Sequence, residues 1–287
     1  MRTPRIFMRK FTCTCICPAA YDAQENLGGM RMGIAVFGAD ERLKLLREML
    51  SETGADAVSA ENEEDFEGRE IFIGKYPFDA PVEKGILRMR AGAKLILLNA
   101  GPVDERFSER FQVYPLMDDA VFVNENALFT AEGAVFRAMQ VSPFALSGEN
   151  VAVIGYGRIG RMLTEMLVGL NAEVTVFSRR ESGRLQAMAR GAKGASCECL
   201  CPMISDFRII FVTSPDRIMS LRELSYVSKD VFLFDLSSKP YGIDHEAAER
   251  LGLSLHVEGA LPGRYCPQSA ARSMYRAVRR ITGGVGL

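Results

Sequence analysis

The sequence predicts an α/β protein with two doubly wound parallel-sheet domains joined by a bridging helix, the second being a Rossmann dinucleotide-binding domain. Three observations predict this fold. The chain has 287 residues, enough for two ordinary domains. Short apolar runs alternate with segments of helical periodicity in both halves. A G-x-G-x-x-G turn, Gly155 to Gly160, separates an expected strand from an expected helix.

The composition is that of a globular protein. Hydrophobic residues make up 48% of the chain and charged residues 25%, which allows a substantial core and argues against disorder. The formal net charge of −1 gives no field that attracts nucleic acid or a membrane surface, and no run approaches the roughly 18 apolar residues of a membrane helix. We therefore expect a soluble, cytoplasmic protein that binds small molecules and protein partners.

The seven cysteines indicate neither a disulfide framework nor a metal site. Their number is odd. Six of them form two clusters, the first at Cys13 to Cys17 and the second at Cys197 to Cys201, and neither cluster has the C-x2-C spacing of a zinc site. We expect reduced thiols and no bound metal. The residues are Cys13, Cys15, Cys17, Cys197, Cys199, Cys201 and Cys266.

The N-terminal part divides at about residue 30. Residues 1–20 are basic and lack both acidic residues and an amphipathic period, so we expect 1–30 to be a disordered extension, with translation naturally beginning at Met30 or Met32. Residues 31–126 predict an α/β domain. Its expected elements are a strand over 32–38, a helix opened by Asp40, and strands over 70–73, 94–98, near Val113 and over 120–123.

Residues 127–148 predict a bridging helix and linker. The helix is expected over 130–139 with Thr130 as its N-cap, and Pro143 disfavours its continuation.

Residues 149–267 predict the Rossmann domain. A terminal helix within 268–287 is expected to pack back on the N-terminal domain. The expected strands are 151–155, 173–177, 208–212, 231–235 and 254–257, and the expected helices are 161–170, 183–190 and 243–251.

The glycine-rich turn has residues suited to holding a pyrophosphate. Gly155 would allow a tight turn, Gly157 the close approach of the ligand, and Gly160 close packing of helix on strand. The following helix offers free N–H groups and a partial positive charge. The alternative is a glycine-rich turn that binds nothing. The candidate residues of this turn are Gly155, Tyr156, Gly157, Arg158, Ile159 and Gly160.

Cofactor choice depends on the residues after the second strand of this domain. NAD enzymes usually have an acidic residue there, whereas this chain has Ser178, Arg179 and Arg180, whose donors suit a 2′-phosphate. NADP(H) is therefore favoured. NAD is the alternative if the arginines are solvated and Glu181 replaces the missing acid.

Three further turns follow strands whose carboxyl ends should meet the ligand crevice. Thr213, Ser214 and Pro215 form the first and are candidate cofactor contacts. The others are Asp235 to Pro240 and Leu261 to Arg264.

Five motifs follow one another along the chain: Gly38 to Arg42, Asn126 to Gly133, Gly155 to Gly160, Asp235 to Gly242, and Leu261 to Gly263 with Pro267 and Ala270. Their order resembles the dipicolinate synthase A-subunit family, in which glycine is common where Tyr241 stands. The resemblance implies oxidation of a hydroxylated or reduced pyridine dicarboxylate to dipicolinic acid. It also implies that the partner is a flavoprotein B subunit of dipicolinate synthase, and that the setting is the mother cell of a spore-forming bacterium.

A dicarboxylate substrate needs arginine or lysine donors and a titratable group near its ring. We expect the Thr130 and Ser238 hydroxyls to line one interdomain cleft with at least one of Arg42, Lys239 and Arg264. His245 and His256 lie away from the motif turns and are expected in core or surface roles. The catalytic candidates are Glu132, Asp235 and Lys239; the substrate-binding candidates are Asp40, Arg42, Asn126, Thr130, Ser238, Gly263 and Arg264.

Two other functions fit the same sequence. One is a nucleotide-binding regulatory protein without chemistry of its own, because no nucleophile and base stand out together. The other is a two-domain dehydrogenase acting on another small carboxylate, which shares the architecture.

Overall fold

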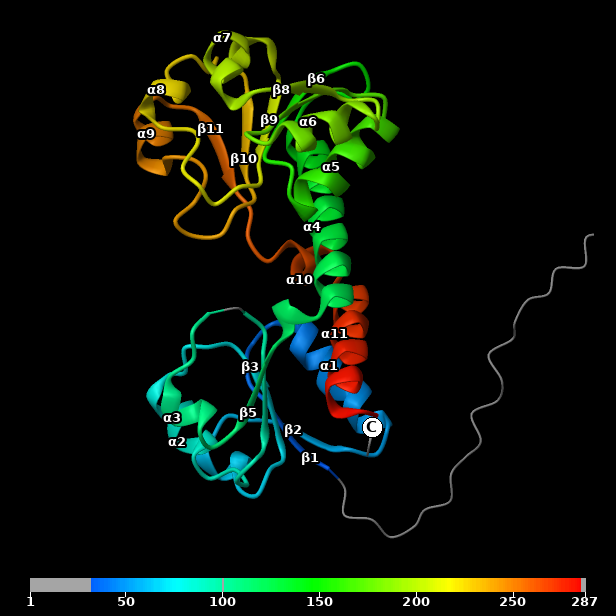
Figure 1. Cartoon of the computed structure of the whole chain (residues 1–287), viewed down its shortest axis with the longest axis vertical. Coiled ribbons are helices and arrows are strands. Elements are labelled where there is room, and N and C mark those ends of the chain that lie inside the picture. The colour runs from blue at the N-terminus through cyan, green and yellow to red at the C-terminus, as the bar shows by residue number, and fades with distance from the viewer. Residues whose placement is uncertain (1–31, 100, 285–287) are drawn as a thin grey trace, which may run out of the picture. The chain divides into compact units, whose positions relative to one another are not determined.

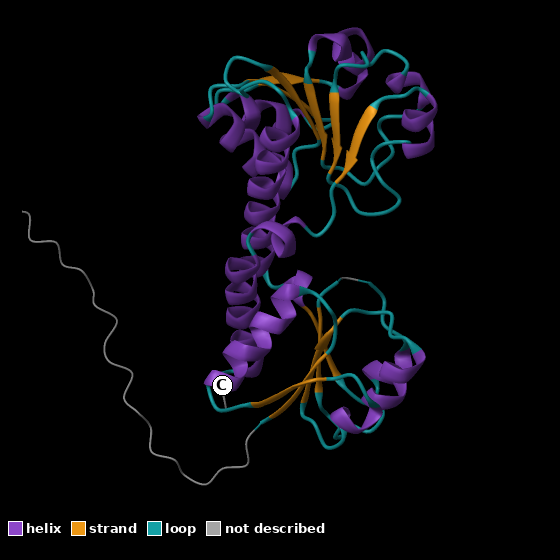
Figure 2. Ribbon diagram, turned by 180° about the vertical axis from the view of Figure 1, so that it is seen from behind, coloured by secondary structure: helices purple, strands orange, loops and turns teal. Residues whose placement is uncertain are grey.

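The computed structural model describes residues 32–99 and 101–284, which contain two parallel sheets with helices on both faces (Figures 1 and 2). The predicted fold class is therefore confirmed. The expected extension over 1–30, and the first cysteine cluster, lie outside the described residues. Among the helices in those two ranges, none is both long and apolar enough to span a membrane.

The first sheet has the strand order β2-β1-β3-β4-β5. This is a doubly wound arrangement, in which the connection from β2 to β3 crosses β1. The sequence did not predict β2, an edge strand with little buried apolar surface. The strands are β1 (Gly33–Val36), β2 (Asp56–Ser59), β3 (Ile71–Gly74), β4 (Lys94–Leu97) and β5 (Gln112–Pro115). The helices are α1 (Glu41–Glu52), α2 (Ala80–Ile86) and α3 (Glu105–Ser108), with short 3-10 turns η1 (Glu63–Phe66) and η2 (Leu116–Asp118).

Alternate side chains of this sheet enter two separate apolar layers, as the period of two in a strand requires. On one face Ile34 packs with Leu46 of α1 and with Met274 of the terminal helix α11 (Pro267–Thr282). On the other face Ala35 packs with Phe72 and with the residues of η1, α2 and α3. The C-terminal segment thus completes the core of the first sheet.

The helix α4 (Ala120–Val141) begins ten residues earlier than expected. Asp119 is its N-cap and accepts a hydrogen bond from the Phe122 N–H, so the prediction of Thr130 as N-cap was wrong. The segment 120–123, expected to be a strand, is the first turn of this helix. An apolar run this short fits a strand and a buried helical turn equally well.

The second sheet has the order β11-β10-β9-β6-β7-β8, which numbered from β6 is the 3-2-1-4-5-6 order of a dinucleotide-binding fold. The sequence did not predict the edge strand β8. The strands are β6 (Asn150–Ile154), β7 (Glu173–Phe177), β8 (Lys193–Ala195), β9 (Ile209–Val212), β10 (Phe232–Asp235) and β11 (Ser254–Val257). The helices are α5 (Arg158–Gly169), α6 (Glu181–Met188), α7 (Leu200–Met203), α8 (Leu221–Leu224), α9 (His245–Arg250) and α10 (Leu261–Tyr265), with 3-10 turns η3 (Cys197–Cys199) and η4 (Ile204–Asp206).

Both faces of the second sheet are buried, which explains why its strands are continuous apolar runs. Val153 faces the layer that contains Leu163 of α5 and Ala134 of α4. Ile154, the next residue, faces the opposite layer with Leu224 of α8. The central strands and the glycine turn that follows β6 are therefore held rigidly from both sides.

Candidate dinucleotide-binding site

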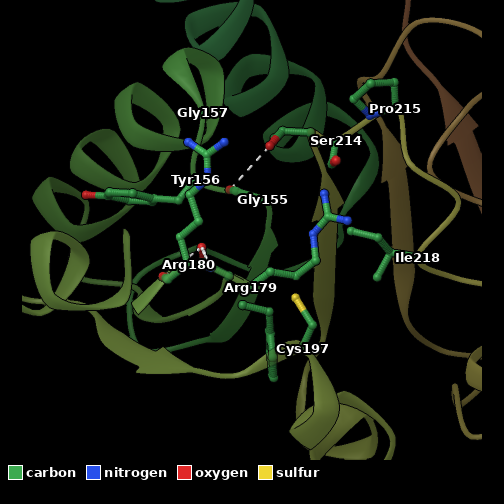
Figure 3. Close-up of a pocket in the computed structure, with 12 residues that line it drawn as sticks. Gly155, Tyr156, Gly157, Arg179, Arg180, Cys197, Ser214, Pro215 and Ile218 are labelled. Carbon is green, nitrogen blue, oxygen red and sulfur yellow. Dashed lines mark hydrogen bonds between the residues drawn. The ribbon is translucent and has the colours of Figure 1, made fainter. Parts of the chain in front are cut away.

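A pocket of about 280 Å³ lies at the carboxyl ends of β6, β7 and β9 (Figure 3). This is the switch point of the second sheet, where the strand order reverses and where open α/β sheets bind their ligands. All nine of the predicted cofactor residues outside the first turn of α5 line it. The lining residues are Gly155, Tyr156, Gly157, Phe177, Ser178, Arg179, Arg180, Cys197, Thr213, Ser214, Pro215 and Ile218.

The three glycines of the turn have different environments. Gly155 has a φ of +101°, and a Cβ there would lie 2.7 Å from Thr213 Oγ1. A Cβ on Gly160 would lie 2.2 Å from the Gly155 carbonyl oxygen, so helix α5 packs against the turn without room for any side chain. A Cβ on Gly157 would meet nothing within 4 Å. The first and third glycines are required by the fold, whereas the second leaves space open toward the pocket.

The amino terminus of α5 is free to bind an anion. Its N-cap is Gly157, which has no side chain to accept a hydrogen bond from the first turn. The unpaired N–H groups and the helix dipole favour a phosphate at this end. Arg158, Ile159 and Gly160 form this first turn and do not line the pocket, and the Ile159 side chain packs against the apolar layer. Any contact of these residues with a phosphate would therefore be made by their backbone N–H groups.

The basic residues after β7 form one wall of the pocket. Ser178 is buried and its hydroxyl bonds with the backbone of Arg180, so this turn has a fixed shape. Arg179 forms an ion pair with Asp216, which follows β9. In Figure 3, Arg180 extends in the direction of the glycine turn and Arg179 toward Ser214 and Ile218.

The second cysteine cluster begins in this pocket. Cys197 lines it, and burial raises the pKa of the Cys197 thiol, although the charges of Arg179 and Arg184 oppose the shift. Cys199 and Cys201 are also free thiols. Among the residues that the structure describes, no three His, Cys, Asp or Glu side chains are grouped to hold a metal ion.

Asp235, a predicted catalytic acid or base, is fully buried and organises the loop after β10. Its carboxylate accepts hydrogen bonds from Ser237 N–H at 3.0 Å, Ser237 Oγ at 2.5 Å and Ile243 N–H at 3.1 Å, and it lies 3.0 Å from His245 Nε2. The loop and His245 of α9 together engage both carboxylate oxygens, and we correct the role of Asp235 from catalytic to structural.

The same loop reaches the edge of the pocket. A Cβ on Gly242 would lie 2.4 Å from the Ser214 carbonyl oxygen, so the loop packs directly on a pocket-lining residue. Ser238 and Lys239 are exposed on it. Tyr241 has a φ of +71° and its ring lies 4.4 Å from that of His245, which explains why glycine is common at this position in the resembling family.

Asp40, Arg42 and Gly263 form a second group with Glu132 and Cys266. A Cβ on Gly263 would lie 2.9 Å from Asp40 Oδ1. The Arg42 side chain bonds both oxygens of Asp40, and although partial burial would raise the Asp40 pKa, these bonds and the arginine charge lower it below the ordinary 3.8. The pKa of Cys266 is raised by burial and by the Glu132 charge, with Arg42 opposing.

Two predicted substrate residues lie inside α4 and have no helix terminus near them. Thr130 is 8% exposed, and its hydroxyl donates to the Asn126 carbonyl oxygen at 2.7 Å. The expectation that this hydroxyl lines a cleft is wrong, because the helix itself uses it. Asn126 is half-buried in the preceding turn.

The sequence did not predict Glu258 and Arg137 as site residues. Glu258 directly follows β11, its side chain is 3% exposed, and it accepts from Arg137 Nε at 2.6 Å and from Arg264 Nη1 at 2.7 Å. Arg264, a predicted substrate contact, thus has Glu258 as a hydrogen-bond partner. The position of Glu258 at the carboxyl end of a strand was a signal that could have revealed it.

Contacts in the structure bring predicted residues together in two groups. The first contains the glycine turn, the 213–215 turn and the Ser237–Gly242 loop; the second contains Asp40, Arg42, Glu132, Gly263 and Cys266. Glu258 bonds to a residue close in sequence to each group. Its N–H donates to the Asp235 carbonyl oxygen, and its carboxylate accepts a hydrogen bond from the Arg264 side chain of α10.

The strand order, the open glycine turn and the pocket define a Rossmann dinucleotide-binding domain. Residues 122–234 match the family described as D-isomer specific 2-hydroxyacid dehydrogenase, NAD binding domain, which indicates a nicotinamide dinucleotide. The D-lactate dehydrogenase of Escherichia coli has a similar fold, with a TM-score of 0.59 and 16% identity over 88% of this chain and 96% of that one.

The resemblance to the A subunit of dipicolinate synthase is confirmed. The chain is 27% identical to that protein from Bacillus subtilis (strain 168) over 156 residues, which are 54% of this chain and about half, 52%, of the relative. The crystal structure of the corresponding protein from Bacillus halodurans superimposes with a TM-score of 0.76 and 22% identity, over 88% of this chain and 99% of that one.

Proposed function

We propose that this chain binds NADP(H) beside the glycine turn and acts as an oxidoreductase of the dipicolinate synthase type. The observation that carries the proposal is the open space at Gly157, in front of an α5 terminus that no side chain caps. A pyrophosphate needs both features, because it must approach the backbone closely and accept its N–H groups.

The residues after β7 support NADP(H) over NAD(H). The positions where an acidic residue would hold a ribose 2′-hydroxyl are occupied by Ser178 and Arg179, and Arg180 follows. Guanidinium groups match phosphate geometry and form charge-assisted hydrogen bonds of about 1.5–3 kcal/mol. We expect NADPH to bind at least about tenfold more tightly than NADH.

The proposed substrate is a reduced or hydroxylated pyridine dicarboxylate, and the proposed product is dipicolinate. A hydroxylated tetrahydro compound would first lose water, and bound NADP+ would supply the two-electron oxidation of the resulting dihydro ring by accepting a hydride while a proton is released. The loop after β10 is suited to hold a carboxylate, because Lys239 is exposed there and has no hydrogen bond or ion pair among the described residues. Ser238 is exposed beside it.

The proposed partner is a flavoprotein B subunit, and the proposed setting is spore formation in the mother cell. Support for the partner comes from the relatives, which are named as the A subunit of dipicolinate synthase, since that name implies at least one further subunit. Co-purification of the two chains from one expression strain is the direct test of the partnership.

The activity is tested with purified chain, alone and with the flavoprotein. We expect NADP+ to be reduced, which the absorbance of the reduced nicotinamide monitors. Dipicolinate should form in equal amount from a dihydrodipicolinate precursor. Calorimetric titration with NADPH and NADH tests the site independently. Failure of both dinucleotides to bind contradicts the proposal.

One observation favours a second function, a nucleotide-binding protein without chemistry of its own. Asp235, the acid expected near the ring, is buried and fully hydrogen-bonded. Tight dinucleotide binding with no turnover unless the flavoprotein is present would select this function over the first.

A further inference from the structure

Arg179 and Arg180 are neighbours in the sequence but have different surroundings. The Arg179 side chain crosses the pocket from the end of β7 to Asp216, beyond the end of β9. Asp216 also accepts a hydrogen bond from Ser214 Oγ at 3.4 Å, which holds the carboxylate on the far side of the pocket. Arg180 has no side-chain hydrogen bond or ion pair within residues 32–99 and 101–284, and it extends toward the glycine turn (Figure 3).

We propose that Asp216 is a specificity-determining residue that lowers the preference for NADPH by engaging the Arg179 guanidinium. This inference rests on the proposed function and names one residue that tunes it. A 2′-phosphate competes with Asp216 for Arg179, whereas NADH has no phosphate at that position. Asp216 therefore penalises NADPH selectively.

The exposure of the pair makes this competition possible. The Arg179 and Asp216 side chains are 67% and 56% exposed, so water screens their attraction and an incoming phosphate can displace the carboxylate. Without the Asp216 charge, Arg179 can bind the phosphate without first breaking an ion pair. Asp216 acts only through Arg179 and needs no contact with the cofactor.

The test is calorimetric titration of NADPH and NADH into Asp216→Asn, which keeps the shape and removes the charge. We expect the NADPH Kd to fall by about threefold to fivefold, with the NADH Kd within about twofold of wild type. Glu249→Gln is the matched control, because Glu249 is an exposed acid on α9 that does not line the pocket. Its NADPH to NADH ratio should equal that of wild type.

The double variant Arg179→Ala/Asp216→Asn separates this role from a structural one. We expect Asp216→Asn to leave the Kd ratio unchanged when Arg179 is absent. An unchanged ratio or weaker NADPH binding in the single variant overturns the inference, and so does an equal shift with and without Arg179. If wild type binds neither dinucleotide, the proposed function itself fails, which is a different result.

Discussion

Each sheet begins with a β-α unit, but only in the first does a side chain cap the amino terminus of the helix. After β1, Asp40 caps α1 by accepting the Arg42 N–H at 3.1 Å, and the Arg42 side chain bonds the same carboxylate. After β6, Gly157 leaves the start of α5 without any side-chain cap. The first turn is closed by its own residues, and the second is left open for a ligand.

This difference shows that fold topology alone does not make an anion site. Both helices begin at the carboxyl end of a parallel strand, and both have a dipole that favours negative charge. In the first turn a carboxylate from the chain occupies that position. In the second, the glycine leaves it available, so the N-cap residue is one feature that distinguishes the two turns.

The largest expected effect is that of Gly157→Val on the dinucleotide affinity of the second turn. The new side chain enters space that is open in the protein, so the fold should be kept, but the pyrophosphate can no longer approach the backbone. We expect NADPH affinity to fall by at least about a hundredfold, which is roughly 2.7 kcal/mol, in calorimetric titration. Ala39→Val makes a β-branched residue at an exposed position of the closed turn and should leave affinity unchanged. Equal binding by wild type and a folded Gly157→Val would show that the open turn holds no dinucleotide.

Gly160→Ala should damage the fold of the same turn. Its Cβ would lie 2.2 Å from a backbone oxygen, so helix and strand must separate, and we expect a loss of about 1–3 kcal/mol in urea unfolding. Gly169→Ala, on the same helix with nothing within 4 Å of the Cβ, should instead be neutral or stabilise by up to about 1 kcal/mol. A Gly160→Ala variant as stable as wild type would contradict the packing role.

The open turn could be predicted from sequence because its signals are local. A buried strand, three glycines at fixed spacing and a following helix all lie within about 20 residues, and each glycine has the backbone role expected of its position. The central strands were also predictable, because both faces are buried and their residues are uniformly apolar. The edge strands β2 and β8 lack that pattern and were missed.

The roles of polar residues were less predictable because they depend on partners distant in the chain or on helix register. Thr130 looked like an N-cap only because the earlier cap, Asp119, precedes a run that also fits a strand. Asp235 ends β10 and Glu258 directly follows β11, but both carboxylates are buried. Asp235 bonds to His245, and Glu258 bonds to Arg137 and Arg264. No spacing rule distinguishes such a carboxylate from one that faces a ligand.

Replacing Asp40 with Ala should open the closed turn at a moderate cost. The α1 terminus loses its cap and Arg42, whose side chain is only 13% exposed, loses its partner, so we expect about 1–2 kcal/mol less stability in urea unfolding. Asp40→Asn keeps an acceptor for the Arg42 N–H and should lose less. Equal stability of all three proteins would mean that the cap contributes nothing to the first sheet.

The smallest expected effect is the pH dependence of the Asp40 contribution. The Asp40 pKa in the folded protein is lowered below 3.8, because the Arg42 hydrogen bonds and charge outweigh the opposing effect of burial. A lowered folded pKa means that the unfolded chain binds the proton more readily, so the carboxylate stabilises the fold above the unfolded pKa and loses this contribution as pH falls through 3.8 toward the folded value. The difference in unfolding free energy between wild type and Asp40→Asn should thus be constant near neutrality and shrink below about pH 4. Arg42→Gln removes the source of the shift and should flatten the same profile. A wild-type advantage that stays constant into this acidic range would show that Arg42 does not hold the Asp40 carboxylate in its ionised form.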